Sequence, residues 1–140
     1  MIVLDTNVVS EAMKLEPDIR VREWLDTALS EDLFLTSITQ AELSFGVMQL
    51  PDGKKKDGLA TALGQIEQLF TGRILPFDSN AAKQYAQLAY RARQAGKGFP
   101  SPDSYIAAIA ASHGFRVATR DTGPFLAAEI EVVNPWEYTP

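Results

Sequence analysis

The chain of 140 residues contains no cysteine, only one histidine and no long apolar run. The absence of cysteine excludes a disulfide scaffold, a thiolate metal site and a cysteine nucleophile. A single histidine excludes a zinc centre built from several imidazoles, and no apolar run reaches the roughly 20 residues that a membrane-spanning helix needs. The first residues, Met-Ile-Val-Leu-Asp, include neither a basic region nor a cleavage site, so we expect a cytoplasmic protein without a membrane segment.

Basic residues are scarce as well. The 13 Lys and Arg residues stand against 18 Asp and Glu residues, which gives a net charge of -5. This balance argues against a protein that coats nucleic acid nonspecifically, because such binding depends on cationic contacts to phosphate. The charge balance does not exclude an enzyme that acts on nucleic acid, because several of the acidic residues could lie together in one site. The length suits a single domain over residues 1–140, with a core of its own.

Short apolar runs alternate with amphipathic stretches along the whole chain. The apolar runs predict five strands, at 2–4, 33–35, 73–77, 115–119 and 130–133. The longer stretches predict helices over about 17–30, 38–50, 59–70, 80–95 and 101–113, with shorter helices after the first and fourth strands. Residues 51–58 are predicted as a polar loop or a frayed helix start, and Gly98-Phe99-Pro100 as a loop.

This alternation predicts an α/β domain with three layers, in which a parallel sheet carries helices on both faces. One residue also indicates where a strand lies in the sheet. Pro76 cannot donate a ladder hydrogen bond, so the strand that contains it should lie at a sheet edge.

Four carboxylates stand where such a sheet would bring them together. Asp5 directly follows the first strand and Asp121 follows the fourth, while Glu42 is expected in the first helical turn after the second. Asp103 opens the helix that leads into the fourth strand. All of these places belong to the carboxyl edge of a parallel sheet, where the ligands of such folds bind.

Each acid also has a simpler structural explanation. Asp5 could cap the first helix, and Asp121 could belong to an ordinary turn. Thr39 and Glu42 have the spacing of a capping box. Asp103 could be an acid in a first helical turn, after Ser101 as N-cap and Pro102 as first helical residue.

Two further polar residues are predicted to have only structural roles. Asp78 follows the strand expected at the sheet edge, and we predict that it caps the next helix. His113 precedes Gly114 at a predicted helix C-terminus, where the helix dipole favours a positive charge.

Together, four ionised carboxylates in one place are hard to explain as caps, because they repel one another. A hard divalent cation such as Mg²⁺ or Mn²⁺ relieves that repulsion and prefers oxygen ligands. The chemistry typical of such a site is metal-assisted phosphodiester hydrolysis. An alternative with an aspartyl nucleophile, as in haloacid-dehalogenase-like phosphatases, requires a second Asp where this chain has Asn7.

Several segments, taken in order, resemble one known family. They are Ile2-Val3-Leu4-Asp5-Thr6-Asn7-Val8-Val9-Ser10, Thr39-Gln40-Ala41-Glu42-Leu43-Ser44-Phe45-Gly46, Asp103-Ser104-Tyr105-Ile106-Ala107-Ala108-Ile109-Ala110, Ala118-Thr119-Arg120-Asp121 and Asn134-Pro135-Trp136. This set is similar to PIN-domain toxins, most of all to the VapC/FitB-type ribonucleases of bacterial toxin–antitoxin pairs. The likeness spans nearly the whole chain.

The resemblance implies a fold and a set of site residues. It implies a five-stranded sheet in the order 3-2-1-4-5, and metal binding by Asp5, Glu42, Asp103 and Asp121. It further implies that Thr6, Asn7 and Thr119 support these acids through hydrogen bonds. Many relatives continue after the fourth acid with an Asp-Phe pair, whereas this chain has Pro124-Phe125 and so lacks one supporting acid.

The resemblance also implies partners. It predicts a Mg²⁺- or Mn²⁺-dependent endoribonuclease that cleaves RNA and forms a homodimer. It predicts an antitoxin that binds operator DNA and inserts an Arg near the acidic site. Two alternatives remain open, a housekeeping RNA-processing PIN nuclease and a catalytically inactive PIN module that only binds a partner.

Overall fold

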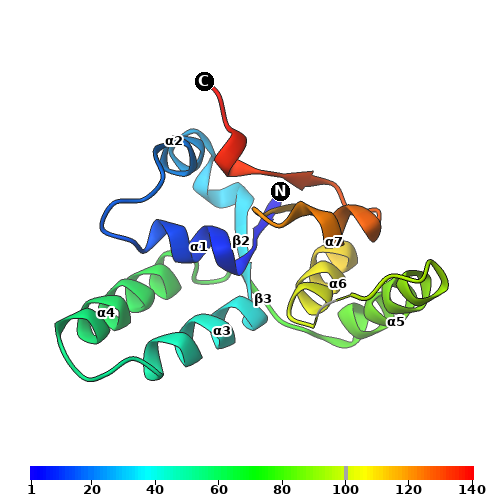
Figure 1. The fold of residues 1–140 in the computed structure, drawn as a ribbon, viewed down its shortest axis with the longest axis horizontal. Helices are drawn as coiled ribbons and strands as arrows, with labels where there is room; N and C mark the ends of the chain where they lie inside the picture. The colour runs from blue at the N-terminus through cyan, green and yellow to red at the C-terminus, as the bar shows by residue number, and fades with distance from the viewer. Residues whose placement is uncertain (100) are drawn as a thin grey trace.

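The computed structural model describes residues 1–99 and 101–140, whose course is shown in Figure 1. Five strands form one parallel sheet: β1 (Ile2–Leu4), β2 (Leu33–Thr36), β3 (Ile74–Leu75), β4 (Arg116–Ala118) and β5 (Val132–Val133). Their order is β3-β2-β1-β4-β5. The predicted fold class and strand order are therefore confirmed, and so is the edge position of the strand next to Pro76.

Helices fill every connection between these strands. The first two connections hold α1 (Thr6–Ala12) and α2 (Ile19–Thr27), then α3 (Ser37–Met48) and α4 (Lys54–Leu69). The last two hold α5 (Ser79–Gln94) and α6 (Asp103–His113), then α7 (Thr122–Ala127). Short 3₁₀ turns cover Ser30–Asp32 (η1) and Pro135–Glu137 (η2). Of the predicted loop 98–100, the last residue lies outside the described residues.

The sheet separates two hydrophobic cores because alternate residues of a strand point to opposite faces. In β1, Ile2 and Leu4 join one core, whereas Val3 joins the other. The first core receives side chains from α1, α2, α3 and α4, and the second receives them from α5, α6 and α7. Figure 1 shows the same division, with α1 to α4 on one side of the strands and α5 to α7 on the other. None of the helices described in 1–99 and 101–140 is long and apolar enough to cross a membrane.

The second helix is shorter than its apolar pattern predicts. It begins after Asp18, whose side chain accepts a hydrogen bond from the amide of Arg20 at 2.9 Å, so Pro17 precedes the cap. It ends at Thr27 because Ala28 is extended, with φ -78° and ψ 140°. Leu29, which falls inside the predicted helix 17–30, consequently lies beyond the helix and is 63% exposed.

The ends of α4, α5 and α6 test other predictions. The helix α4 starts at Lys54, so residues 54–58 of the predicted loop or frayed helix start are helical, and only 51–53 precede the helix. Asp78 caps α5 by accepting a hydrogen bond from the amide of Ala81 at 2.9 Å, as predicted. Gly114 ends α6 with φ 70°, a left-handed conformation that glycine adopts without steric cost.

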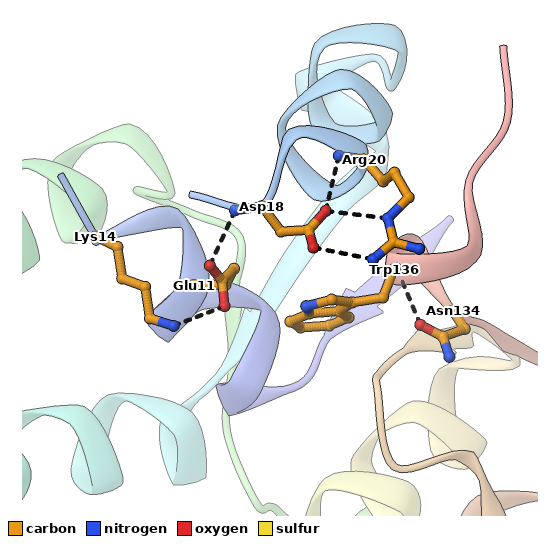
Figure 2. A network of polar contacts seen from close by, with 6 residues as sticks. All are labelled: Glu11, Lys14, Asp18, Arg20, Asn134 and Trp136. Carbon is orange, nitrogen blue, oxygen red and sulfur yellow. Dashed lines mark hydrogen bonds and ion pairs between the residues drawn. The ribbon is translucent and has the colours of Figure 1, made fainter. Parts of the chain in front are cut away.

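A polar network that the sequence analysis missed fixes the connection between α1 and α2 (Figure 2). Glu11 is buried, and its two carboxylate oxygens accept hydrogen bonds from Lys14 Nζ and the Asp18 amide, each at 3.0 Å. Asp18 in turn binds the guanidinium of Arg20 through both oxygens. Asn134 caps η2 nearby in the same view, accepting from the amide of Trp136 at 3.0 Å. The loop is thus held by a carboxylate rather than by apolar contacts alone.

A candidate active site at the carboxyl edge of the sheet

Asp5 leaves β1 at the centre of the sheet and is only 3% exposed. One of its oxygens, Oδ1, accepts a hydrogen bond from the Thr6 amide at 2.7 Å, so Asp5 does cap α1. The other oxygen, Oδ2, accepts from the Thr119 hydroxyl at 2.8 Å. Asp5 therefore fits both explanations given above, since it is a helix cap and also lies at the expected edge.

Thr119, which directly follows β4, has a fully used hydroxyl. It donates its proton to Asp5 and accepts hydrogen bonds from Asn7 Nδ2 at 3.3 Å and from the Asp121 amide at 3.0 Å. One donor and two acceptor positions are all that a hydroxyl offers. Asn7 also accepts from the Arg120 amide at 3.3 Å, so the segment after β4 is tied to the start of α1. Thr119 and Asn7 thus hold the Asp5 carboxylate in one orientation.

Glu42 is oriented by two threonines of different elements. Thr6 donates its hydroxyl proton to Glu42 Oε1 at 2.7 Å, and the hydroxyl oxygens of Thr6 and Thr39 are 2.9 Å apart. Because the single proton of Thr6 is already used, Thr39 must donate to Thr6. This role of Thr39 is hidden in the sequence, where its spacing to Glu42 suggests a capping box instead.

The predicted capping box of Thr39 and Glu42 is wrong. The strand β2 continues to Thr36, and Thr36 is the N-cap of α3, accepting from the Thr39 amide at 3.1 Å. Glu42 consequently lies in the second turn of α3, too far along the helix to reach back to its cap. The pair of threonines three residues apart at the end of an apolar run was the signal that could have placed this cap.

Asp103 is the first residue of α6 and is half-buried. The cap position is taken by Pro102, with no side-chain hydrogen bond, so the predicted capping role of Ser101 is wrong. Burial, and after it the negative charges of Asp5, Asp121 and Glu42, together raise the pKa of Asp103 from 3.8 to about 6. The electrostatic influence of the three other acids places all four in one region.

Burial also raises the pKa of Asp5 above its ordinary value. The hydrogen bonds from Thr119 and Thr6 oppose this rise, and the charges of Glu42 and Asp121 add to it. In the structure, desolvation is the largest cause for both Asp5 and Asp103, with repulsion second in importance or lower.

Asp121 is the most exposed of the four acids. It stands at the start of α7, and its side chain makes no capping hydrogen bond there. The structural explanation as an ordinary turn is wrong, because α7 begins at Thr122 and contains Pro124 within its first turn. A proline is compatible with this place because the first amides of a helix have no partner within it.

The chemistry of these side chains fits a hard cation better than a soft one. All of the donors that converge here are carboxylate, hydroxyl or amide oxygens, the ligands that Mg²⁺ and Mn²⁺ prefer. Within 1–99 and 101–140, however, no group of three or more His, Cys, Asp or Glu side chains is arranged so that it could hold one ion. The donor set thus fits a divalent cation by its chemistry, although no three of the described acids are already placed around one point.

Comparison with known proteins gives consistent matches over the whole chain. The PIN domain model matches residues 2–130. The "VapC ribonuclease Y4jK" of Sinorhizobium fredii is 49% identical over 98% of this chain and 99% of that protein. "Toxin FitB" of Neisseria gonorrhoeae is 52% identical over 97% and 99%. The solved structure of FitAB bound to the IR36 DNA fragment has a TM-score of 0.94 at 49% identity, covering 100% of this chain and 99% of that one.

These matches span both cores and all of the elements that carry the acids, so they concern the complete fold and not an isolated motif. The chain belongs to the PIN-domain family.

Proposed function

We propose that this protein is an endoribonuclease that depends on Mg²⁺ or Mn²⁺, and that it is the toxin of a type II toxin–antitoxin pair. The observation that carries the proposal is the coupling of four acids at the carboxyl edge, where burial and like charge raise the pKa of Asp103 to about 6. Relatives named as a VapC ribonuclease and as toxin FitB, about half identical over nearly the whole chain, support the reaction and the biological role.

In this proposal Asp5, Glu42, Asp103 and Asp121 bind the divalent cation. When bound, the ion supplies positive charge for the phosphate oxygens and activates water for attack. Thr119 and Asn7 fix the orientation of Asp5. Thr6 and Thr39 do the same for Glu42. A carboxylate whose orientation is already fixed loses little entropy when it binds, which favours metal affinity.

The charge of the chain explains why the cation is also needed to bind the substrate. With the four site acids neutralised, the net charge of -5 would become -1, so the rest of the protein is nearly neutral. Phosphate is then attracted by bound cations rather than by a basic surface. Arg120 is the nearest basic residue in sequence to the site and stacks over Trp136 at 5.2 Å, whereas Arg116 begins β4 at the opposite edge.

The same acids offer a means of inhibition. A guanidinium can bridge two carboxylates and take the place of a cation. We therefore propose an antitoxin that inserts an Arg near Asp5, Glu42 or Asp103. Co-expression with the product of an adjacent reading frame tests it: the two proteins should co-purify, and Arg→Ala changes in the partner's C-terminal segment should restore cleavage.

The structure of FitAB bound to DNA supports a further part of this proposal. A toxin homodimer would bring two antitoxin chains together on an operator with two half-sites. Light scattering of the purified protein and of the co-purified complex measures the oligomeric state. A toxin that is monomeric, and whose complex with the antitoxin does not bind its own promoter DNA, contradicts this part of the proposal.

Cleavage is tested with purified protein, single-stranded RNA and Mn²⁺. We expect chelator, Asp5→Asn and Asp103→Asn to abolish cleavage while the circular dichroism spectrum is kept. Asp78→Asn is the matched control, because Asp78 follows β3 in the corresponding place yet serves as a cap. Full cleavage in chelator, or by the Asp5→Asn protein, contradicts the mechanism.

The two alternatives give different results in the same experiments. An inactive PIN module that only binds a partner would show no cleavage and no stabilisation by Mn²⁺. A housekeeping RNA-processing nuclease would cleave RNA but would co-purify with no neighbouring gene product. If the purified protein cleaves RNA, sequencing the RNA ends that it produces would identify the substrate.

A further inference from the structure

Three aromatic side chains form a cluster that includes a residue from the first turn of α6, the helix that Asp103 begins. They are Phe77, which lies between β3 and α5, Tyr85 on α5 and Tyr105 on α6. Their ring centroids are 6.3 Å apart for Phe77 and Tyr85, 5.3 Å for Phe77 and Tyr105, and 5.2 Å for the two tyrosines. All three rings are half-buried. We call Phe77, Tyr85 and Tyr105 the aromatic cluster.

From this cluster we infer that the protein has a subsite that stacks one base of a single-stranded RNA next to the cleaved phosphate. The inference rests on the proposed ribonuclease function. Stacking on aromatic rings is how proteins bind unpaired bases without reading their edges, because every base has a π face.

The position of Tyr105 connects the cluster to the acids. Tyr105 follows Asp103 by two residues in the first turn of α6. At 3.6 residues per turn, that separation turns the side chain by roughly 200° around the helix axis. Tyr105 is therefore close to Asp103 along the helix but points to the α5 side of it. The cluster therefore lies across the start of α6 from Asp103, at the place of a neighbouring nucleotide rather than of the cleaved phosphate.

Phe77 lies at the same edge of the sheet. It follows β3 closely at its carboxyl end, as Asp5 follows β1 and Thr119 follows β4. On their inner sides, Phe77 and Tyr85 pack against the core that contains Leu88 and Ile106. This packing fixes the rings from behind, so that a base would meet a preformed surface at small entropic cost.

The two phenol groups are free to meet a ligand. Neither Tyr85 Oη nor Tyr105 Oη takes part in a hydrogen bond within residues 1–99 and 101–140. Neither is among the fully buried unpaired atoms of that part of the chain, where Ser104 Oγ is found. A purely structural tyrosine in a core rim usually gives its hydroxyl a partner. These two reach the surface with their rings half-covered, as a stacking surface requires.

The test removes one base from the RNA and one ring from the protein. A single abasic nucleotide is moved through the positions on both sides of the cleavage site, with cleavage measured in Mn²⁺. Wild type should show one position where the abasic nucleotide raises KM about 5- to 100-fold with little change in kcat. Tyr85→Leu and Tyr105→Leu, which keep apolar bulk but lose the π face, should raise KM for intact RNA and become insensitive to that abasic nucleotide.

Two matched variants serve as controls. Tyr105→Phe keeps the ring and should behave as wild type. Tyr90→Leu removes a tyrosine of α5 that is 64% exposed and lies outside the cluster, and its KM should not change. Thermal melts of all variants identify any that fail to fold. If one of Tyr85→Leu and Tyr105→Leu fails to fold, the KM of the other tests the inference. Unchanged KM in Tyr85→Leu and Tyr105→Leu, or persistent sensitivity to the abasic nucleotide, overturns the inference while the ribonuclease function stands.

A second readout separates this inference from the function on which it rests. If wild type cleaves no RNA at all, an oligoribonucleotide that contains 2-aminopurine still reports stacking through quenching of its fluorescence. Quenching that is lost in both leucine variants keeps the subsite and removes only the catalytic proposal. Quenching that is absent, or that survives both substitutions, overturns the subsite. If the leucine variants weaken the binding of a protein inhibitor but not of RNA, the aromatic cluster binds a protein and the inference is wrong.

Discussion

Neutralising Asp103 should stabilise the metal-free protein at neutral and alkaline pH. The carboxyl group has a pKa of about 6 in the folded protein against 3.8 for an ordinary Asp. The folded state therefore holds its proton more tightly than the unfolded chain does. Stability that this group contributes is complete below about pH 4 and is lost as pH rises through about 6. Above that range, the charged carboxylate lowers the free energy of unfolding, and Asp103→Asn removes this effect.

The expected gain in stability follows from the size of the pKa shift of Asp103 and from the exposure of its side chain. Between 3.8 and about 6, the shift corresponds to about 3 kcal/mol at most, at about 1.4 kcal/mol for each unit. Asp103 is only half-buried, so solvent screening reduces this figure. The acid also gains about 0.3–1 kcal/mol from the helix dipole at the start of α6, which the variant gives up. We expect Asp103→Asn to gain about 1–2 kcal/mol above pH 7.5, a rise in Tm of about 3–7 °C.

Thermal melts in chelator at pH 4.5 and pH 8, followed by melts with Mn²⁺, check this prediction. The gain should be present at pH 8 and nearly absent at pH 4.5, and Mn²⁺ should stabilise wild type much more than the variant. Asp26→Asn, at an exposed position of α2, controls for the loss of one negative charge. A variant that is less stable than wild type in chelator at pH 8, yet gains normally from Mn²⁺, would refute the reasoning and leave Asp103 as a helix-terminal acid only.

Three further changes test single contacts. Thr119→Val removes the donor to Asp5, and should cost about 1–3 kcal/mol and lower Mn²⁺ affinity about 10- to 100-fold, measured by melts and metal titration. Glu11→Ala should cost about 1–3 kcal/mol at pH 7. That cost should disappear as pH falls through the folded pKa, which hydrogen bonds from Lys14 and the Asp18 amide lower despite the opposing effect of burial. Asp78→Ala should cost about 1 kcal/mol and Asp78→Asn almost nothing, with Mn²⁺ binding unchanged in both.

The sheet could be predicted from the sequence because its strands are apolar runs with no competing pattern. Pro76 added independent information, since a missing amide can be tolerated only where no neighbouring strand needs it. Helix ends were less predictable because a single backbone conformation decides them. Ala28 leaves the helix although nothing in its side chain prevents it from continuing, and Leu29 is exposed as a result.

The positions of the acids could be predicted, but their environment could not. Asp5 and Asp103 follow from the rule that parallel strands end at one edge. Burial, which is the main cause of both raised pKa values, depends on how α1 and α6 pack and is not visible in the sequence. Thr39 was misassigned because its spacing to Glu42 satisfies a local rule. The longer strand β2 moves the true cap to Thr36 and frees Thr39 for a contact across the site.

Local spacing rules miss the contacts of the site for one physical reason. Its polar side chains make hydrogen bonds to residues far away in sequence, as Thr6 does with Glu42 and Thr119 with Asp5. Local rules describe partners within about one helical turn, so they assign such residues to caps or turns. The two long-range bonds connect α1 to α3 and the end of β4 to the end of β1. A side chain that bridges elements in this way orients an acid and also fixes the edge of the sheet, which is why Thr119→Val should affect metal binding and stability together.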